Sequence, residues 1–359
     1  MGNIYQNKKV FITGDTGFKG SWLSLFLKQM GAEVMGYALP PEHENNHYVA
    51  LQMSKYIQHI DGDIRDIAKL KQSIYSFQPD FIFHLAAQSL VRRSYLEPKR
   101  TFDTNIAGSV NVLEAIRDCE SVKVLIYVTS DKCYSNKEWL WGYRESDELG
   151  GKDPYSASKA AAEIVFWSYL QSFFNSGHVL GAASVRAGNV IGGGDWAEDR
   201  LIPDSMRAIL QNKSLELRNP AATRPWQHVL EPLFAYLLLG ARLYENPQKF
   251  SGSWNFGPRN ESSRSVLEVA SAFMKHWGKE DGIEVNGDTT YREEAVLHLN
   301  SDKAFYMLNW KQAWDFERTL KETADWYWRY SSGEPAFQIS LEQIQAYLKS
   351  QEDRGCRID

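Results

Sequence analysis

Short apolar runs alternate with helix-like segments through the first third of the chain. The apolar runs predict strands at residues 9–13 (KVFIT), 33–39 (EVMGYAL), 81–87 (FIFHLAA) and 123–129 (KVLIYVT). Between them, segments such as 21–30 and 105–117 place apolar residues at helical spacing. Strands that are apolar at nearly every position are buried on both faces, and helical connections between them favour parallel pairing. The pattern therefore predicts an α/β fold with a doubly wound parallel sheet.

The regular alternation is lost in the second half of the chain. Glycines and prolines interrupt residues 188–203, and helical segments follow near 320–330, which is rich in Trp, and near 341–348. Residues 253–256 have the pattern of a strand that returns to the main sheet. We therefore expect a smaller C-terminal lobe that is interleaved with the main domain. Trp326 and Trp328 are expected in the core of this lobe.

Charge and cysteine content exclude several classes of protein. A formal net charge of -5 gives no electrostatic basis for binding nucleic acid or an anionic membrane. Cys119, Cys133 and Cys356 are odd in number and widely spaced, so we expect no disulfide framework and no metal site. Residues 1–10 contain no apolar signal core, and the longest apolar stretch, 232–241, is about half of a membrane span. We expect a soluble cytoplasmic protein.

Three glycines separate the first predicted strand from the first predicted helix. Gly14, Gly17 and Gly20 lie in the sequence TGDTGFKG, which also contains Thr16 and Phe18. Glycines allow a tight turn, and they let backbone N–H groups approach a pyrophosphate at the positive end of the helix. A structural turn is the alternative, but the position between strand and helix favours a dinucleotide site.

The end of the second strand carries no carboxylate. In many dinucleotide folds such a group binds the hydroxyls of the adenosine ribose. Here residues 36–39 contain no acid, and Glu42 follows a few residues later. Asp63, in GDIRD after a third strand-like segment, is a candidate acceptor for the adenine amino group, with Ile64 beside it. NAD is the expected cofactor, and Lys19 keeps NADP open as the alternative.

A Ser, Tyr and Lys set predicts redox chemistry at a hydroxyl group. Tyr155 and Lys159 are four residues apart at the start of a helical run, so they share one helix face. A nearby ammonium group lowers the pKa of a phenol, which lets the phenolate take a proton from a sugar hydroxyl. Ser130 follows the strand at 123–129 and completes a triad.

Further motifs are shared with a known family. They are HLAA at residues 84–87, Asn105 before a helix, RAGN at 186–189 and RPWQHV at 224–229. With the glycine loop and the triad, they resemble the extended short-chain dehydrogenases/reductases, from about residue 9 to residue 328. The resemblance implies a Rossmann-type dinucleotide-binding domain and a substrate-binding lobe. We assign the first to 1–185 with returns at about 224–257, and the second to 186–223 and 258–359.

The resemblance also implies which residues contact the ligands. The cofactor contacts are expected from Gly14, Thr16, Gly17, Phe18, Gly20, Asp63, Ile64, Leu85, Ala86, Ala87, Asn105, Tyr155 and Lys159. A sugar nucleotide is expected at Gln88, Asn189, Arg200, Arg224, His228 and Arg292. Asn189 and Arg224 are the expected diphosphate contacts, since an Arg fork suits phosphate. A buried structural role for His228 and a solvated charge for Arg292 remain the alternatives.

The triplet Ser130-Asp131-Lys132 distinguishes reactions within the family. Two titratable residues after the hydroxyl are typical of 4,6-dehydratases, whereas epimerases generally lack them. Residues 16–23 (TGFKGSWL), 129–134 (TSDKCY) and 186–196 (RAGNVIGGGDW) are most similar to the dehydratases that act on CDP-glucose. Asp15 departs from the His expected there. A 4-epimerase, a dehydratase of another nucleotide sugar and a non-catalytic cofactor sensor are the alternatives.

The resemblance implies a three-stage reaction and a role for each catalytic side chain. Tyr155 takes the O4 proton while C4 is oxidised, and Ser130 hydrogen-bonds O4. Asp131 is the candidate acid for loss of the C6 hydroxyl as water. Lys132 is assigned to the C5 step, either as a base or as a cation that stabilises the enolate.

The resemblance also implies how the chain assembles and where its product is used. The helix that begins at Tyr155, with Ala157, Ala160, Ala161, Ile164 and Val165, is expected to form a homodimer together with the helix before it. A tetramer is the alternative. The product is expected to serve deoxysugar synthesis of the O-antigen type.

Overall fold

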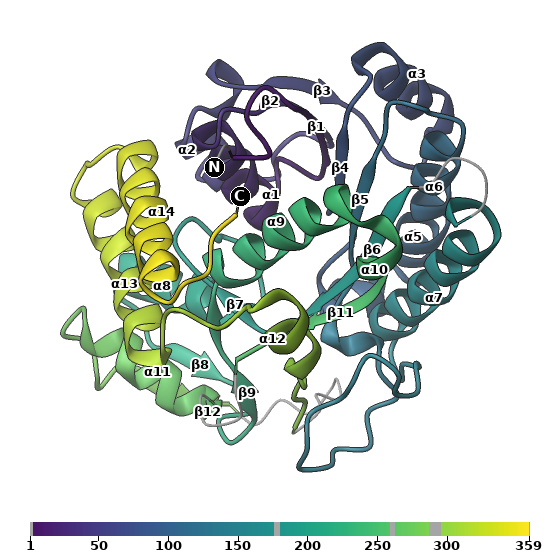
Figure 1. Ribbon diagram of the computed structural model, residues 1–359. Coiled ribbons are helices and arrows are strands. Elements are labelled where there is room, and N and C mark those ends of the chain that lie inside the picture. The colour runs from purple at the N-terminus through teal and green to yellow at the C-terminus, as the bar shows by residue number, and fades with distance from the viewer. Residues whose placement is uncertain (1–2, 176–179, 259–262, 287–295, 359) are drawn as a thin grey trace.

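A parallel seven-stranded sheet forms the centre of the molecule (Figure 1). In this computed structural model, residues 3–175, 180–258, 263–286 and 296–358 are described. The strands are β1 (Lys9–Thr13), β2 (Glu33–Ala38), β3 (Gln58–Asp61), β4 (Phe81–His84), β5 (Val124–Val128), β6 (Gly181–Ala187) and β11 (Gly252–Phe256). They are ordered β11-β6-β5-β4-β1-β2-β3, and every pairing is parallel. The order runs outward in both directions from β1 and β4, as a doubly wound sheet requires.

Helices cover both faces of the sheet. One face packs against α1 (Phe18–Gln29) and α9 (Leu230–Glu245), and the other against α3 (Ile67–Phe77), α6 (Ser109–Arg117) and α7 (Pro154–Tyr169). The strand side chains alternate between the two layers: Val10 and Ile12 belong to the first cluster, and Phe11 belongs to the second. Because both faces are buried, strands that are apolar at every position fit this sheet.

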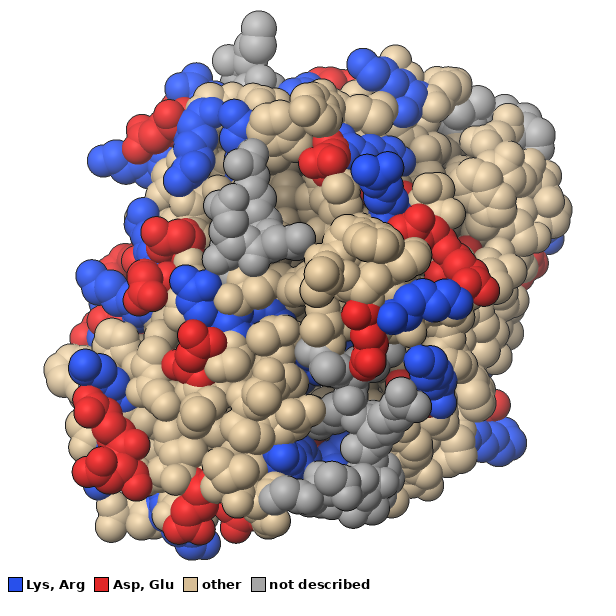
Figure 2. Space-filling view, turned by 90° about the horizontal axis from the view of Figure 1, so that it is seen from below, with Lys and Arg blue, Asp and Glu red and all other residues tan. Residues whose placement is uncertain are grey.

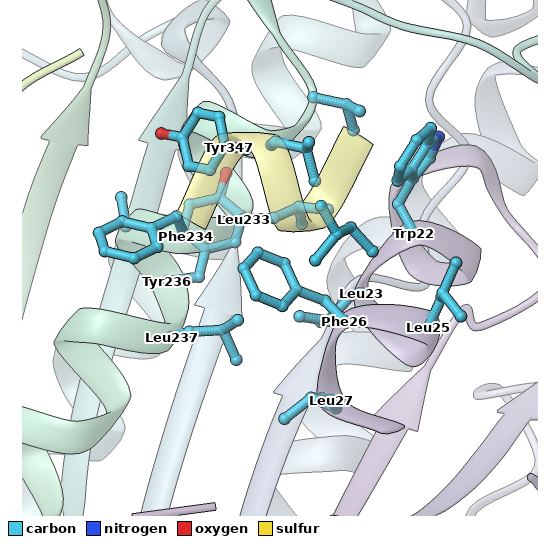
Figure 3. Close-up of a cluster of buried hydrophobic side chains, with 14 of the residues drawn as sticks. Trp22, Leu23, Leu25, Phe26, Leu27, Leu233, Phe234, Tyr236, Leu237 and Tyr347 are labelled. Carbon is cyan, nitrogen blue, oxygen red and sulfur yellow. The ribbon is translucent and has the colours of Figure 1, made fainter. Parts of the chain in front are cut away.

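The first layer also anchors the C-terminal helix α14 (Ala336–Asp353). Figure 3 shows Trp22 and Phe26 of α1 beside Leu233 and Phe234 of α9, with Tyr347 of α14 at the edge of the same cluster. Each of these side chains is at most 1% exposed. The C-terminal helix therefore shares one hydrophobic core with helices α1 and α9 on this face of the sheet.

The smaller lobe lies beside the sheet (Figure 1). Its elements are α8 (Leu201–Gln211), β8 (Leu215–Leu217), β9 (Thr223–Pro225), β12 (Ser263–Ser265), α11 (Val266–Lys275), β13 (Ile283–Val285), α13 (Phe316–Ser331) and α14. Strands β9 and β12 pair antiparallel, and β8 and β13 pair parallel. Strands β7 (Val190–Ile191) and β10 (Gln227–His228) form a third short pair.

The remaining elements are short connections. They are α2 (His47–Ala50), η1 (Met53–Lys55), α4 (Val91–Leu96), α5 (Pro98–Phe102), the π-helical η2 (Asp103–Gly108), η3 (Asp131–Cys133), the π-helical η4 (Leu170–Phe174), α10 (Pro247–Phe250) and α12 (Asp302–Leu308).

The predicted alternation of strands and helices agrees with the structure, with two differences. Strand β11 is the expected return to the sheet, but the residues before α9 do not return, because β9 and β10 pair with β12 and β7. The expectation for Trp328 was also wrong. Trp326 is fully buried, whereas Trp328 is 55% exposed. Residues two apart on a helix point in different directions, so the amphipathic helix α13 buries only the first.

On the face shown in Figure 2, acidic and basic side chains are interspersed. Cys119, Cys133 and Cys356 are buried and free. Within the described ranges, no group of His, Cys, Asp and Glu residues could hold a metal ion. No helix in this part of the chain is both long and apolar enough to cross a membrane.

Replacing Leu233 by Ala tests the shared core. Leu233 is fully buried between α1 and α9, so the cavity is expected to lower the free energy of unfolding by about 3 kcal/mol. Chemical denaturation measures the change. Leu210→Ala is the matched control, because Leu210 is 57% exposed and its loss is expected to change stability by less than about 0.5 kcal/mol. Equal effects of the two substitutions would contradict the proposed packing.

Candidate active site

A cleft of about 1000 Å³ opens over the carboxyl ends of the sheet strands, toward the lobe. Its walls come from the loops after β1, β2, β3, β4 and β5 and from the lobe segment that includes α8. It spans the point between β1 and β4 where the strand order reverses, which is where open α/β sheets bind ligands. The volume lies at the upper end of the range for small-molecule sites, so the cleft has room for a large or a two-part ligand.

The glycine loop forms one wall of this cleft. Gly14 has a φ of +82°, and a Cβ there would lie 2.7 Å from the backbone nitrogen of Ala86, so a larger residue does not fit. The Gly17 amide donates to the Gly14 carbonyl, and the Thr16 hydroxyl donates to the Leu39 carbonyl at 2.9 Å. Helix α1 begins directly after Gly17. The loop therefore presents a helix N-terminus to the cleft, as a bound diphosphate would require. All five predicted residues of this loop line the cleft: Gly14, Thr16, Gly17, Phe18 and Gly20.

The neighbouring wall carries arginine and carboxylate pairs. Asp63 accepts from the Arg65 guanidinium at 2.6 and 3.0 Å, and Glu42 accepts from Arg93 at 2.7 and 3.3 Å. Asp63, Glu42 and both arginines line the cleft, as do the predicted residues Ile64, Leu85, Ala86 and Ala87. Each of these two cations is therefore already neutralised by a carboxylate.

Asn105 does not line the cleft. Its side chain is 1% exposed and lies in η2. Its amide donates to the Gln88 carbonyl at 3.0 Å and to the Ser158 hydroxyl at 2.9 Å, and its oxygen accepts from the Gln88 amide at 2.8 Å. These bonds fix the loop after β4 against α7, so they give Asn105 a positioning role, and its direct contact with the cofactor stays a prediction.

The predicted triad comes together at the end of β5. Ser130 donates a hydrogen bond to Asp131 at 2.9 Å, and its oxygen accepts from the Lys132 amide at 3.2 Å. Tyr155 and Lys159 occupy the first turns of α7, which begins at Pro154 because Asp153 caps the Ser156 amide. All five predicted catalytic residues, Ser130, Asp131, Lys132, Tyr155 and Lys159, line the cleft.

Burial dominates the titration of the Tyr and Lys pair. It raises the pKa of Tyr155 to about 12, although the hydrogen bond with Ser130 opposes this shift. It also lowers the pKa of Lys159 to about 8, against the attraction of Glu163. In the protein without its ligands, desolvation of the phenolate is therefore the largest effect on the pKa of Tyr155.

Asp131 has the environment of an acid. It is 5% exposed, and burial raises the pKa of its carboxyl group, against the nearby Lys132, Ser130, Arg224 and Lys19. Burial makes the protonated form of Asp131 more favourable than it is in a solvent-exposed Asp, and a general acid has to be protonated before it acts. Lys132 beside it is half-buried.

Lys19 was not predicted to reach the reacting groups. Burial lowers the pKa of its ammonium group to about 8, and Arg200 and Lys159 lower it further, while Asp131 raises it. Lys19 therefore lies among the charges around Asp131. Its place in TGFKG, one residue before the last loop glycine, was the available signal.

The predicted substrate residues separate into three groups. Gln88, Asn189, Arg200 and Arg224 line the cleft, and Arg200 pairs with Asp195 at 2.9 Å. Arg292 lies outside the described residues. His228 does not line the cleft, and its burial favours the structural alternative over a contact with substrate.

His228 is fully buried in an aromatic cluster. Its ring centroid lies 4.8 Å from that of Trp314 and 6.1 Å from that of Trp22. Burial lowers the pKa of the imidazole to about 3, so it is neutral. Arg224 of the RPWQHV motif therefore lines the cleft, whereas His228 of the same motif lies in the core.

Sequence reasoning also missed cations of the lobe. Arg207, Lys213 and Arg218 line the same cleft, and Arg218 pairs with Asp199 at 2.8 Å. They lie in and after α8, outside every motif, so no local signal distinguished them from solvated surface charges.

A buried ion pair lies behind the catalytic residues. Arg186 of β6 binds Glu163 of α7 at 2.8 and 2.9 Å, and both side chains are at most 2% exposed. Glu163 also accepts from Ser184 at 2.7 Å and from Thr129, the residue before Ser130. Burial raises the pKa of Glu163, but Arg186 and these hydroxyls outweigh it and hold the pKa below its usual value. The pair connects α7 with β5 and β6.

Comparisons with known proteins agree with this geometry. The model of the family described as GDP-mannose 4,6 dehydratase matches residues 11–323. The CDP-glucose 4,6-dehydratase of Salmonella typhimurium is 45% identical over 352 residues, which cover 97% of this chain and 98% of the relative. A dTDP-glucose 4,6-dehydratase of Xanthomonas campestris is 26% identical over 335 residues, covering 88% of this chain and 92% of the relative.

A solved structure has the same fold. The dTDP-glucose 4,6-dehydratase of Bacillus anthracis, solved with NAD, superposes with a TM-score of 0.76 at 22% identity, covering 91% of this chain and 98% of that one. The family model and the near full-length relative decide the assignment, and the solved structure agrees with it in fold. The chain therefore belongs to the NAD-dependent epimerase/dehydratase family.

Proposed function

We propose that the chain converts CDP-glucose to CDP-4-keto-6-deoxyglucose and water. The observation that carries this proposal is the buried Asp131, which is hydrogen-bonded to Ser130 in the cleft that Tyr155 also lines. Dehydration needs an acid beside the triad, and epimerisation does not. The choice of CDP-glucose is supported by the 45% identity with the Salmonella enzyme over nearly the whole chain.

NAD is the cofactor that best fits the cleft. The glycine loop and the N-terminus of α1 suit a diphosphate, and the loops after β2, β3 and β4 complete the wall. NAD is favoured over NADP because Arg65 and Arg93 are already paired with Asp63 and Glu42. An additional phosphate would have to displace these carboxylates.

The protein residues carry the proton transfers of the reaction. Bound NAD supplies the hydride chemistry, by which C4 is oxidised and C6 is later reduced. Tyr155 takes the O4 proton, and Ser130, which lies beside the phenol, hydrogen-bonds O4. The raised pKa of Tyr155 disfavours its phenolate. The phenol proton must therefore pass to a neighbouring group, or the bound ligand must stabilise the phenolate.

Asp131 and Lys132 act in the elimination. The 4-ketone acidifies C5, and Asp131, whose raised pKa favours its protonated form, donates a proton to the leaving C6 hydroxyl. Lys132 lies next to it in η3 and acts at C5. Asn189 and Arg224, which both line the cleft, are the proposed contacts of the sugar-nucleotide diphosphate.

We also propose a homodimer, a cytoplasmic location and a role in deoxysugar synthesis of the O-antigen type. Free cysteines suit a reducing compartment. The outward face of α7 supports the dimer, because Ile164 is 60% exposed and Trp167, three residues later, is 52% exposed. Ala160 of the same helix is buried inside the chain and is not available to a partner.

A panel of nucleotide sugars tests the reaction. With NAD and then with NADP, we expect CDP-glucose to lose the mass of one water, and dTDP-, GDP- and UDP-glucose to react poorly. Deuterium at C4 is expected at C6 of the product, because the hydride returns within the same turnover. Mass spectrometry follows both changes. Unchanged mass with inverted C4 would indicate an epimerase, and preference for another nucleotide would contradict the assignment to CDP-glucose.

Lys132→Ala and Tyr155→Phe separate the stages of the reaction. Without Lys132, C4 oxidation is expected to proceed and elimination to stop, so the absorbance of reduced nicotinamide persists in a single turnover. Without the Tyr155 hydroxyl, no such absorbance is expected, because the first step fails. Near-normal turnover and C5 exchange with solvent deuterium in Lys132→Ala would place Lys132 outside the chemistry.

Light scattering tests the dimer. At micromolar concentration we expect twice the chain mass, and Ile164→Glu is expected to give monomers because it places a charge in an apolar interface. Tyr306→Glu is the control, since Tyr306 is 80% exposed on α12. A monomeric wild-type protein would contradict the proposal.

A further inference from the structure

Asp15 of the glycine loop points away from the cleft. It lies between Gly14 and Thr16, but its side chain is fully buried and does not line the cleft. Its carboxylate sits over Gly36 of β2, where a Cβ would lie 2.0 Å from the Asp15 Oδ2 atom. Only glycine at position 36 leaves space for this carboxylate. The glycine loop is thus anchored in the sheet by the residue that departs from the pattern of its family.

The partner of Asp15 is His59 of β3. Its Nδ1 atom lies 2.7 Å from Oδ2 of Asp15, and its Nε2 atom lies 3.2 Å from Oδ1 of Asp61. Ionised carboxylates only accept hydrogen bonds, and a neutral imidazole carries one N–H group. With both carboxylates ionised, both contacts form at once only when His59 is an imidazolium. Burial raises the pKa of Asp15, and the hydrogen bond and the charge of His59 oppose this shift. The geometry therefore suits a cation between two carboxylates.

Few other groups act on this cluster. The titratable groups that face His59 are Asp15 from the glycine loop, Asp61 from its own strand and Tyr48 from α2, whose ring centroid is 5.4 Å away. Burial raises the pKa of Tyr48 to about 12, so it remains neutral. Strand β2 contributes Gly36, which carries no charge. The Oδ1 atom of Asp15 has no hydrogen-bond partner. The Asp15 carboxylate therefore depends on His59 for its compensation.

We propose that Asp15 and His59 are positioning residues for the cofactor, and that the His59 proton keeps the glycine loop competent to bind a diphosphate. This inference rests on the proposed use of NAD. While His59 is protonated, the Asp15 charge beneath the loop is neutralised. When the proton leaves, one of the two hydrogen bonds is lost, and an uncompensated buried carboxylate lies below the amides that hold an anion. Buried charges are only weakly screened, so the diphosphate is repelled.

The sign of the pH dependence follows from the protonated state. Burial lowers the pKa of His59, but the hydrogen bonds and charges of Asp15 and Asp61 outweigh it and raise the pKa above 6.5. Affinity for NAD is therefore greatest below this raised pKa and falls as pH increases through it. Lys19 and Lys159 of the cleft also titrate near pH 8. The pH dependence of the wild-type affinity therefore combines several groups. The contribution of His59 is obtained by comparing the pH dependence of NAD affinity in wild type with that in the His59 and Asp15 variants.

Dissociation constants for NAD, measured by calorimetry between pH 6.5 and 9, test the inference with three variants. In wild type, affinity is expected to fall with pH. Asp15→Asn is expected to reduce this fall about tenfold, because it removes the charge that His59 compensates. His59→Gln is expected to weaken binding about tenfold at pH 6.5. The double variant Asp15→Asn/His59→Gln is expected to restore it, which a merely structural role would not do.

A fourth variant, at an exposed position, covers the case in which the buried positions do not tolerate change. Asp61 is 68% exposed in its side chain, so Asp61→Asn is expected to fold and to move the midpoint of the pH dependence downward. An unchanged midpoint, or wild-type pH profiles in Asp15→Asn and His59→Gln, overturns the inference while the proposed function stands. A wild-type protein that binds no NAD at any pH overturns the proposed function instead.

Discussion

The buried ion pair between Arg186 and Glu163 is the constraint on which the catalytic geometry depends. Glu163 lies one turn beyond Lys159 on α7, and its partners come from β5 and β6. Removing one member would leave a charge buried without compensation, which in other proteins destabilises by about 3–5 kcal/mol. The pair therefore fixes the helix that carries Tyr155 against β5, the strand that Ser130 follows.

Around this fixed centre the two parts of the chain supply different chemistry. The strand ends supply the glycine loop, Asp131 and the triad, and the lobe supplies arginines such as Arg200 and Arg224. The shared core of α1, α9 and α14 connects both parts, so the lobe cations face the same cleft as the triad. Burial then sets the proton affinities, because desolvation acts most strongly on groups far from water, such as Asp131 and Tyr155.

Two buried carboxylates near the ends of strands β1 and β5 illustrate how environment decides a role. Asp131 is surrounded by cations and a hydroxyl group in the cleft, so it can exchange a proton with a ligand. Asp15 is buried beside the glycine loop, and its carboxylate is paired with His59. The same functional group acts chemically in one place and as an anchor in the other.

The sequence by itself determined the strand and helix pattern, the glycine loop and the triad, because apolar periodicity and short motifs are local properties. It also identified Asp131 as a candidate acid. Only the tertiary structure decided that His228 is buried, that Asn105 supports a loop, and that Lys19 approaches Asp131. Exposure, proton affinity and contacts between distant residues, such as Asp15 and His59, depend on which surfaces pack together. Packing is a property of the whole chain, so no local pattern of residues contains it.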